Sequence, residues 1–424
     1  MAPKSERTPV LATDTSDTSV TEDTRAPAAR SPAEDGSSSR DALTDPNANG
    51  PATQWWKPVL LFLAFTAVLF LVAGLSLAHL PYTGTDVRRH PFPGQSWLEA
   101  WVHGDGFWYG DIAERGYWSF MPSQQGPLAF FPTYPLLMRV VSYAVGNSLL
   151  AGILLTVAAG ATAAGLFFTW LRDRVSPAAA WTALLLFLLY PFAYYLYGAV
   201  YADAVFIASV LGAFVLLERD HPWLAGLVGA LATAGRPVGG VLVVALLIRV
   251  VERRDGWRQV PWRDVGVLLS AAGLGAFCIW SWHRFGTPLA FVEAQKGWDQ
   301  DPGVGTWLKV QFWEDVQDFR SPLAWLVFVS HPILTVVGLA LVPRVVRRFG
   351  WGYGSYALLV IALSAISTKN FFGMSRYVLS AFPCFAVAGE LLAERVRLRA
   401  VALSASGLVL VAATSFYARG HYLS

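Results

Sequence analysis

Long apolar runs separated by short connections fill the chain after residue 54. A helix needs about 20 mainly apolar residues to cross the hydrocarbon core of a bilayer. The pattern therefore predicts an all-α polytopic membrane protein, a transmembrane helical bundle of about 11 spans. The expected spans lie near 58–80, 148–171, 178–197, 203–219, 222–235, 237–251, 265–284, 323–342, 351–367, 376–394 and 399–417.

Two of these runs, 222–235 and 237–251, are too short to cross a bilayer comfortably. Between them lies Arg236, followed directly by Pro237, which breaks the helical pattern. Interrupted apolar segments with a polar residue at the break are common where membrane proteins build sites at depth. We therefore expect Arg236 to belong to a site.

The arginines predict the orientation of the spans, because cytoplasmic connections carry an excess of Lys and Arg. The basic connections alternate with neutral ones, which places the N-terminal tail inside and two hydrophilic loops, 81–147 and 285–322, outside. This assignment requires 128–146 to form an interfacial helix, as two prolines and Arg139 favour. The basic connections carry Arg172 and Arg174, Arg219, the cluster from Arg249 to Arg263, Arg344 to Arg348, and Arg395 to Arg399.

Residues 1–54 differ from the rest, since they are rich in Ser, Thr, Pro, Ala and acidic residues and nearly free of large apolar ones. Such a segment buries too little surface to offset the entropy of ordering, so we expect a disordered cytoplasmic tail. It is too long and too acidic for a signal peptide. The remainder, 55–424, is expected to form one transmembrane domain.

Composition supports the membrane assignment. Hydrophobic residues make up 54% of the chain and charged residues only 14%, against about 25% charged in soluble domains. The 18 Trp, 15 Tyr and 26 Phe exceed what interfacial anchoring needs and leave some for a binding surface. A net charge of +3 is too small to indicate nucleic acid. Cys278 and Cys384 lie in apolar runs, as inert core residues do.

The first expected outer loop carries three carboxylates among five aromatic residues between positions 103 and 118: Asp105, Asp111 and Glu114. A carboxylate at the membrane surface, flanked by rings, suits removal of a proton from a hydroxyl beside a lipid-linked substrate. If 107–115 is helical, Asp111 and Glu114 share a face and Asp105 lies at its start. Asp105 can equally be the N-cap of that helix.

Arg236 and Arg376 interrupt apolar stretches close to the expected outer surface. Arginine presents a planar fork of donors suited to phosphate. Arg376 can instead be a snorkelling anchor, and Arg236 can instead form a structural ion pair. Asp203, at the expected outer start of a span, is either an N-cap or the partner of Arg236. Lys369 and Lys296 on outer loops are weaker candidates.

No Walker loop, GxGxxG unit or HExxH motif occurs. This argues against a nucleotide-driven pump, a zinc protease and a Rossmann-type transferase. No cofactor is expected. A divalent cation is left open, although His103 with Asp105 would make only a thin metal site.

Taken in order, the motifs resemble those of the PIG-V-like (GPI mannosyltransferase 2-like) family, which belongs to the GT-C class of polytopic glycosyltransferases. The resemblance runs from about residue 58 to 395. The chain departs from the usual pattern at three places: Gly235 replaces a hydroxyl residue, Asp203 replaces glutamate, and His103-Gly104 replaces arginine-tryptophan before the aspartate. The matching stretches are 105–109, 112–117, 130–139, 201–206, 225–239 and 285–298.

The resemblance implies an inverting mannosyltransferase that takes mannose from a polyprenyl-phosphate donor to a hydroxyl of a lipid-glycan or glycoprotein acceptor. Asp105 matches the expected base, and Arg236 and Arg376 would steady the departing polyprenyl phosphate. Asp203 and Lys369 are further expected substrate contacts. Its location would be the cell membrane, or the endoplasmic reticulum in a eukaryote, with an extracytoplasmic active site. The remaining expected substrate contacts are Asp111, Glu114, Trp108, Tyr109 and Tyr134.

Three alternatives stay open from the sequence. A lipid or glycan transporter or flippase would line a translocation path with the same charges, and would carry internal repeats, of which no convincing one is found. A non-catalytic scaffold would tolerate loss of Asp105. A GT-C enzyme using another sugar would have the same residues.

Overall fold

The structure is a computed structural model that describes residues 56–423, apart from 86–87, 122–123, 255, 299, 301–302 and 319–320. The chain divides into residues 1–51 and a unit from residue 52 onward. The tail for which the sequence predicts disorder, 1–54, lies outside the described residues. The helices and contacts described are those of the second unit.

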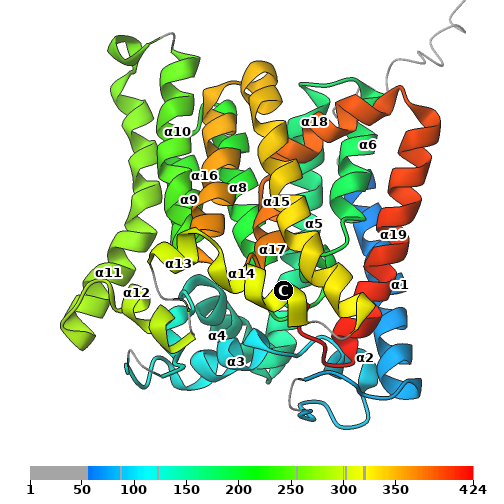
Figure 1. The fold of residues 1–424 in the computed structure, drawn as a ribbon. Coiled ribbons are helices and arrows are strands. Elements are labelled where there is room, and N and C mark those ends of the chain that lie inside the picture. Colours follow the sequence, from blue (N-terminus) through cyan, green and yellow to red (C-terminus); the bar gives the residue numbers. More distant parts are fainter. Residues whose placement is uncertain are drawn as a thin grey trace, which may run out of the picture. The chain divides into compact units, whose positions relative to one another are not determined.

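Helices are the regular elements of the described chain (Figure 1). Short 3₁₀ helices interrupt the α-helices where proline or glycine interferes with the regular backbone. The α-helices are α1 (Trp56–His79), α2 (Ser96–Glu99), α3 (Asp105–Arg115), α4 (Thr133–Val145), α5 (Ser148–Arg172), α6 (Pro177–Leu188), α7 (Tyr194–Tyr197), α8 (Asp203–Glu218), α9 (Pro222–Thr233), α10 (Gly240–Arg253), α11 (Ala272–Phe285), α12 (Ala290–Ala294), α13 (Val304–Trp307), α14 (Val310–Asp318), α15 (Pro322–Phe349), α16 (Trp351–Ser367), α17 (Met374–Ser380), α18 (Phe382–Ala393) and α19 (Val396–Ala418). The 3₁₀ helices are η2 (Pro127–Ala129), η3 (Pro237–Gly239), η4 (Trp257–Gln259), η5 (Trp262–Ala271) and η6 (Gln295–Trp298).

The protein is an all-helical polytopic membrane protein. Five described helices are long and apolar enough to cross a bilayer, and the bent pair α17 and α18 adds a sixth if it is one span. Shorter apolar helices are α6, α9 and α16. The count is lower than the expected 11 because several apolar runs form short or broken helices. The five long ones are α1, α5, η5 joined to α11, α15 and α19.

Two spans expected to be continuous are not. The run 178–197 ends as a helix at Leu188 and resumes only as the single turn α7, with Pro191 between them. Proline removes a backbone donor and clashes with the preceding turn, which ends the helix. The run 376–394 bends by 75° between α17 and α18, where Pro383 opens the second helix. The predicted break at Arg236 is confirmed, since α9 ends at Thr233.

The helices run side by side between two ends (Figure 1). One end gathers α3, α4, α12 and α14, and we call it the loop end. The opposite end carries the turn after α10 and the connection from α18 to α19, and we call it the arginine end. There Glu218 accepts a hydrogen bond from Arg249 at 2.7 Å and lies 3.4 Å from Arg174. The basic connections that the sequence places on one side therefore meet at one end.

Helix α8 lies at the centre of the bundle. It is apolar on all sides, as a fully enclosed helix should be, and nearly all its residues are buried. Small residues allow neighbouring helices to approach closely elsewhere in the bundle. A Cβ on Gly389 of α18 would lie 2.5 Å from the Cβ of Ala183 on α6. The central position of α8 gives its first residue, Asp203, a fully buried setting.

Candidate active site

Four charged residues from separate segments meet towards the loop end, and we call them the charged cluster. Asp105 is the first residue of α3, and Asp203 is the first residue of α8. Arg236 lies directly before η3, and Arg376 lies in α17. The sequence had selected all four as site candidates, from positions far apart in the chain.

Arg376 bridges the two carboxylates. Its Nη2 lies 2.9 Å from Asp203 Oδ2, its Nε lies 3.4 Å from Asp203 Oδ1, and its Nη1 lies 3.4 Å from Asp105 Oδ2. Arg236 donates through Nη1 to Asp203 Oδ1. Asp203 thus binds both guanidinium groups, while Asp105 contacts only Arg376 within the cluster.

Burial separates the two carboxylates. Asp203 is fully buried, and Arg236 and Arg376 are also buried. Asp105 retains 17% exposure of its side chain, the largest of the four. The more exposed carboxylate of the cluster is therefore the one that the sequence predicts as the base.

Tyrosine rings cover the guanidinium faces. Arg376 lies 4.8 Å from the ring centre of Tyr195 and 4.7 Å from that of Tyr201. Arg236 lies 4.6 Å from the ring centre of Tyr377. Stacking on aromatic faces suits the weakly hydrated guanidinium group and holds its plane in a fixed direction. The remaining N–H groups can then point towards an anion.

Local backbone features position Asp105. Gly104 caps α3 with a φ of +52°, a conformation that favours glycine. A Cβ on Gly104 would lie 2.7 Å from the hydroxyl oxygen of Tyr201. That hydroxyl instead accepts a hydrogen bond from the Asp105 backbone N–H at 3.2 Å. Glycine here lets the tyrosine approach and fix the start of the helix.

The other cluster residues are also placed by their local backbone. Arg236 precedes Pro237 and is extended, with φ −154° and ψ 149°, as residues before proline usually are. Asp203 lies in the first turn of α8, where the helix dipole favours a carboxylate. These local backbone preferences and the ion pairs favour the same positions of Arg236 and Asp203.

Burial raises the pKa of Asp105 above its ordinary value, while the positive charge and hydrogen bond of Arg376 oppose that rise. A carboxylate with a raised pKa is a stronger base than an exposed one. The Asp105 carboxylate is therefore partly exposed, has a raised pKa and lies beside the cationic Arg376.

The structure decides several alternatives that the sequence left open. Gly104, not Asp105, is the N-cap of α3, so the capping interpretation of Asp105 is wrong. Ala202 likewise precedes Asp203 as the N-cap of α8, whereas the predicted ion pair of Asp203 with Arg236 is confirmed. Arg376 is buried and paired inside the protein, so the snorkelling interpretation is wrong.

No group of three or more His, Cys, Asp or Glu that could hold a metal ion occurs among the described residues. His103 is buried beside the ring of Tyr417, with the two ring centres 5.3 Å apart and nearly perpendicular. The contact is one of packing.

The aromatic candidates differ in their placement. Trp108 is half-buried one turn after Asp105, and its ring stacks with Trp118 and Phe130 at 6.2 and 5.8 Å. Tyr109 is buried against Tyr134. Tyr134 is fully buried and its hydroxyl donates to the Gly152 carbonyl at 2.8 Å, which makes it part of the packing. Trp108 is thus the accessible ring of the three.

The two other acidic candidates, Asp111 and Glu114, have partners outside the charged cluster. Asp111 pairs with Arg115 on the same helix at 2.5 Å, and Glu114 accepts a hydrogen bond from Ser148 at 2.7 Å. Lys369 lies half-buried in the loop between α16 and α17, which leads into Arg376.

The sequence prediction missed the tyrosines around Arg376. Tyr201 belongs to a motif that was recognised only for its aspartate, and Tyr195 lies in a run expected to be an ordinary span. The signal was present as an unusual density of tyrosine in 190–201. Tyr422 lies beyond all the motifs that the sequence analysis recognised.

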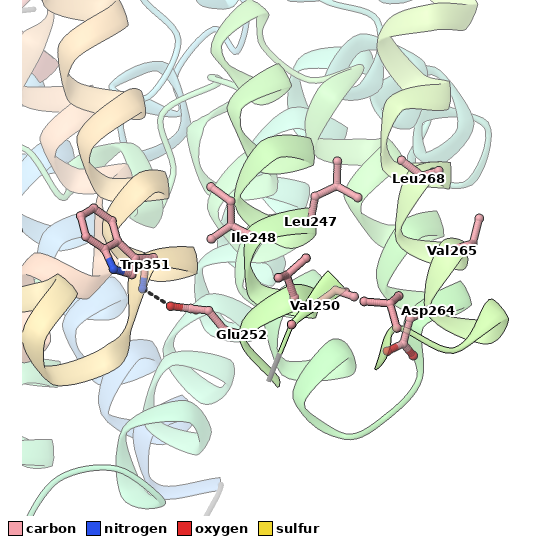
Figure 2. A pocket seen from close by; sticks show the side chains of 11 residues that line it. Leu247, Ile248, Val250, Glu252, Asp264, Val265, Leu268 and Trp351 are labelled. Atoms are coloured by element: carbon pink, nitrogen blue, oxygen red, sulfur yellow. Dashed lines mark hydrogen bonds between the residues drawn. The ribbon is translucent and has the colours of Figure 1, made fainter. Parts of the chain in front are cut away.

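A groove of about 610 Å³ lies at the arginine end (Figure 2). Leu247, Val250 and Leu268 are among its apolar lining residues. Glu252, at its edge, accepts a hydrogen bond from the Trp351 backbone N–H. The groove is formed by α10, η5 and the start of α16, and it contains none of the charged cluster.

Comparison with known proteins gives only remote likenesses. No family model and no curated protein matches the chain. The structure is similar to the crystal structure of ArnT from Cupriavidus metallidurans bound to undecaprenyl phosphate, at 13% identity over 86% of this chain and 77% of that chain, with a TM-score of 0.48.

A second likeness is to the oligosaccharyltransferase of Archaeoglobus fulgidus. The structure of this enzyme, AglB, in complex with an inhibitory peptide and a dolichol-phosphate aligns over 86% of this chain and 56% of that chain. The sequence identity is 14% and the TM-score is 0.44. The chain thus spans about half the length of that protein. At these values the likenesses assign neither a family nor a substrate.

Proposed function

We propose that the protein is a membrane glycosyltransferase of the GT-C class that transfers a sugar from a polyprenyl-phosphate donor to an acceptor hydroxyl with inversion. The charged cluster is the observation that carries the proposal, because it sets one accessible carboxylate against two buried arginines. The motif resemblance adds mannose as the sugar and a lipid glycan or glycoprotein as the acceptor. The extracytoplasmic location of the site belongs to the same proposal.

In this mechanism Asp105 accepts the proton of the acceptor hydroxyl as its oxygen attacks the anomeric carbon. The bond between that carbon and the phosphate oxygen breaks, and polyprenyl phosphate leaves with the electron pair. Attack from the face opposite the leaving group inverts the anomeric centre. A positioned base of this kind is worth about 10²–10⁴ in rate.

Arg376 and Arg236 would hold the phosphate. With Asp105 and Asp203 ionised, two negative and two positive charges balance, so an incoming phosphate must draw an arginine from a present partner. The 3.4 Å contact of Arg376 with Asp105 is the looser one, compared with 2.9 Å to Asp203. Donor binding would therefore weaken the contact to Asp105 and free its carboxylate for the acceptor.

Trp108, stacked with Trp118 and Phe130, would contact the sugar or the isoprenoid chain. Sugars present apolar C–H faces that pack on aromatic rings, and isoprenes are apolar throughout. Asp203 would act as a positioning residue that holds both guanidinium groups in place.

The test is transfer of label from polyprenyl-phosphate [¹⁴C]mannose to an acceptor in membranes that contain the protein, with analysis of the product. Asp105→Asn should insert normally and lose about 10²–10⁴ in rate, which is about 2.7–5.4 kcal/mol of barrier. Asp173→Asn is the matched control, because its exposed side chain lies after α5 beside Arg172, at the arginine end.

Activity of Asp105→Asn within threefold of the parent would remove Asp105 from the mechanism and favour a scaffold. Movement of intact labelled donor across the membrane without a new glycoside would favour a flippase. Transfer of glucose or arabinose in place of mannose would keep the class and change the sugar.

A further inference from the structure

The segment after α19, residues 419–423, folds back to the loop end. The Gly84 backbone N–H donates to the Arg419 carbonyl at 3.0 Å. On the other side, His331 Nε2 of α15 lies 3.0 Å from the Leu423 carbonyl oxygen. The segment is thus tied both to the chain after α1 and to α15.

A pair of glycines makes this path possible. Gly420 ends α19 with a φ of +80°, and the following His421 N–H donates back to the Phe416 carbonyl at 3.1 Å, as in a Schellman cap. A Cβ on Gly420 would lie 2.0 Å from the Tyr82 hydroxyl, and one on Gly84 would lie 1.9 Å from the Gly420 carbonyl carbon. Larger residues would push the segment away.

This path brings Tyr422 to the charged cluster. A Cβ on Gly104, the residue before Asp105, would lie 3.3 Å from the Tyr422 ring. The ring also packs against Phe372, with centres 5.5 Å apart, in the loop that leads to Arg376. Burial of the hydroxyl and the nearby Asp105 carboxylate raise the pKa of Tyr422. The residue as a whole keeps 45% exposure.

We propose that the exposed ring of Tyr422 forms a contact surface for the sugar unit of the acceptor, beside the hydroxyl that Asp105 deprotonates. This inference rests on the proposed function and specifies a hexopyranoside-bearing acceptor. The ring lies next to Gly104 and so on the Asp105 side of the cluster. A donor phosphate held by Arg236 would lie on the Asp203 side, because Arg236 pairs with Asp203.

The test measures binding of octyl α-mannopyranoside, below its critical micelle concentration, to the full chain in nanodiscs by saturation-transfer difference NMR. Tyr422→Ala should weaken binding about 3–10-fold, as loss of one aromatic contact does. Tyr422→Phe keeps the ring and should bind within about twofold of the parent. Tyr143→Ala is the matched control, since Tyr143 is a highly exposed tyrosine of α4.

Binding of polyprenyl phosphate, measured in the same nanodiscs, should be unchanged in Tyr422→Ala. The proposal is overturned if the parent does not bind the mannoside saturably, if Tyr422→Ala binds it like the parent, or if both ligands weaken equally. If the parent protein does not bind polyprenyl phosphate, this result would instead count against the proposed function. If the alanine variant fails to fold, Tyr422→Leu, which keeps the bulk but removes the aromatic face, should show the same weakening of mannoside binding.

Discussion

At the scale of single residues, Asp203 is the centre of the charged cluster, although Asp105 is the proposed base. Asp203 is fully buried and binds two arginines, whereas Asp105 is partly exposed and binds one. Breaking a buried ion pair is costly because it leaves an uncompensated charge, about 3–5 kcal/mol. In the proposed mechanism the two carboxylates therefore have different roles: Asp203 holds the cluster together, and Asp105 reacts.

The first prediction at this scale concerns stability. Asp203→Ala leaves both Arg236 and Arg376 without their buried partner, whereas Arg236→Ala leaves Asp203 paired with Arg376. We expect Asp203→Ala to lower the thermal unfolding midpoint more than Arg236→Ala, measured by tryptophan fluorescence in detergent. Equal shifts would contradict the assignment of Asp203 as the shared partner.

The second prediction concerns pH. Asp105 must be ionised to act as a base, so kcat/KM should rise with pH and level off above the pKa of Asp105 in the free enzyme. Arg376 lowers that pKa against the effect of burial. Arg376→Gln should therefore move the acidic limb to higher pH, while Arg376→Lys, which keeps the charge, should move it less. An unchanged limb in Arg376→Gln would mean that another group titrates.

At the scale of elements, the sequence predicted where the apolar segments lie and that one of them breaks at Arg236, but not the breaks after Leu188 and between α17 and α18. Asp105, Asp203, Arg236 and Arg376 were recoverable because each is a charge in an apolar or aromatic setting. The pair of Asp203 with Arg236 was foreseen as one alternative, but the contacts of Arg376 with both carboxylates join distant segments and are encoded by no local pattern. The C-terminal placement of Tyr422 was missed for the same reason.

The loop between α16 and α17 supplies a prediction for one such element. Lys309, before α14, donates to the carbonyls of Ala365 and Thr368, near the end of α16, and burial lowers its pKa to about 8. Lys309→Met should release the loop that leads to Arg376 and speed hydrogen exchange in 368–373. Lys296→Met, on an exposed side chain, is the control and should leave that exchange unchanged.

The molecule as a whole separates two kinds of charge network. At the arginine end, Glu218 binds Arg249 at 2.7 Å and the Tyr353 hydroxyl at 2.8 Å. These pairs join connections that the sequence places on the cytoplasmic side. The charged cluster lies at the other end of α8, whose first residue is Asp203 and whose last residue is Glu218. Because positive charge on short loops sets membrane orientation, we expect the arginine end to face the cytoplasm and the charged cluster to lie towards the opposite side.

Orientation can be measured by labelling with a membrane-impermeant maleimide in intact cells, in a background where Cys278 and Cys384 are replaced by alanine. Tyr143 on α4 at the loop end is 83% exposed, and Trp257 on η4 at the arginine end is 72% exposed. If the arginines face the cytoplasm, Tyr143→Cys should label from outside, and Trp257→Cys should label only after the membrane is permeabilised. The reverse pattern would put Asp105 on the cytoplasmic side, where an extracytoplasmic donor cannot reach it, and the proposed reaction would have to be abandoned.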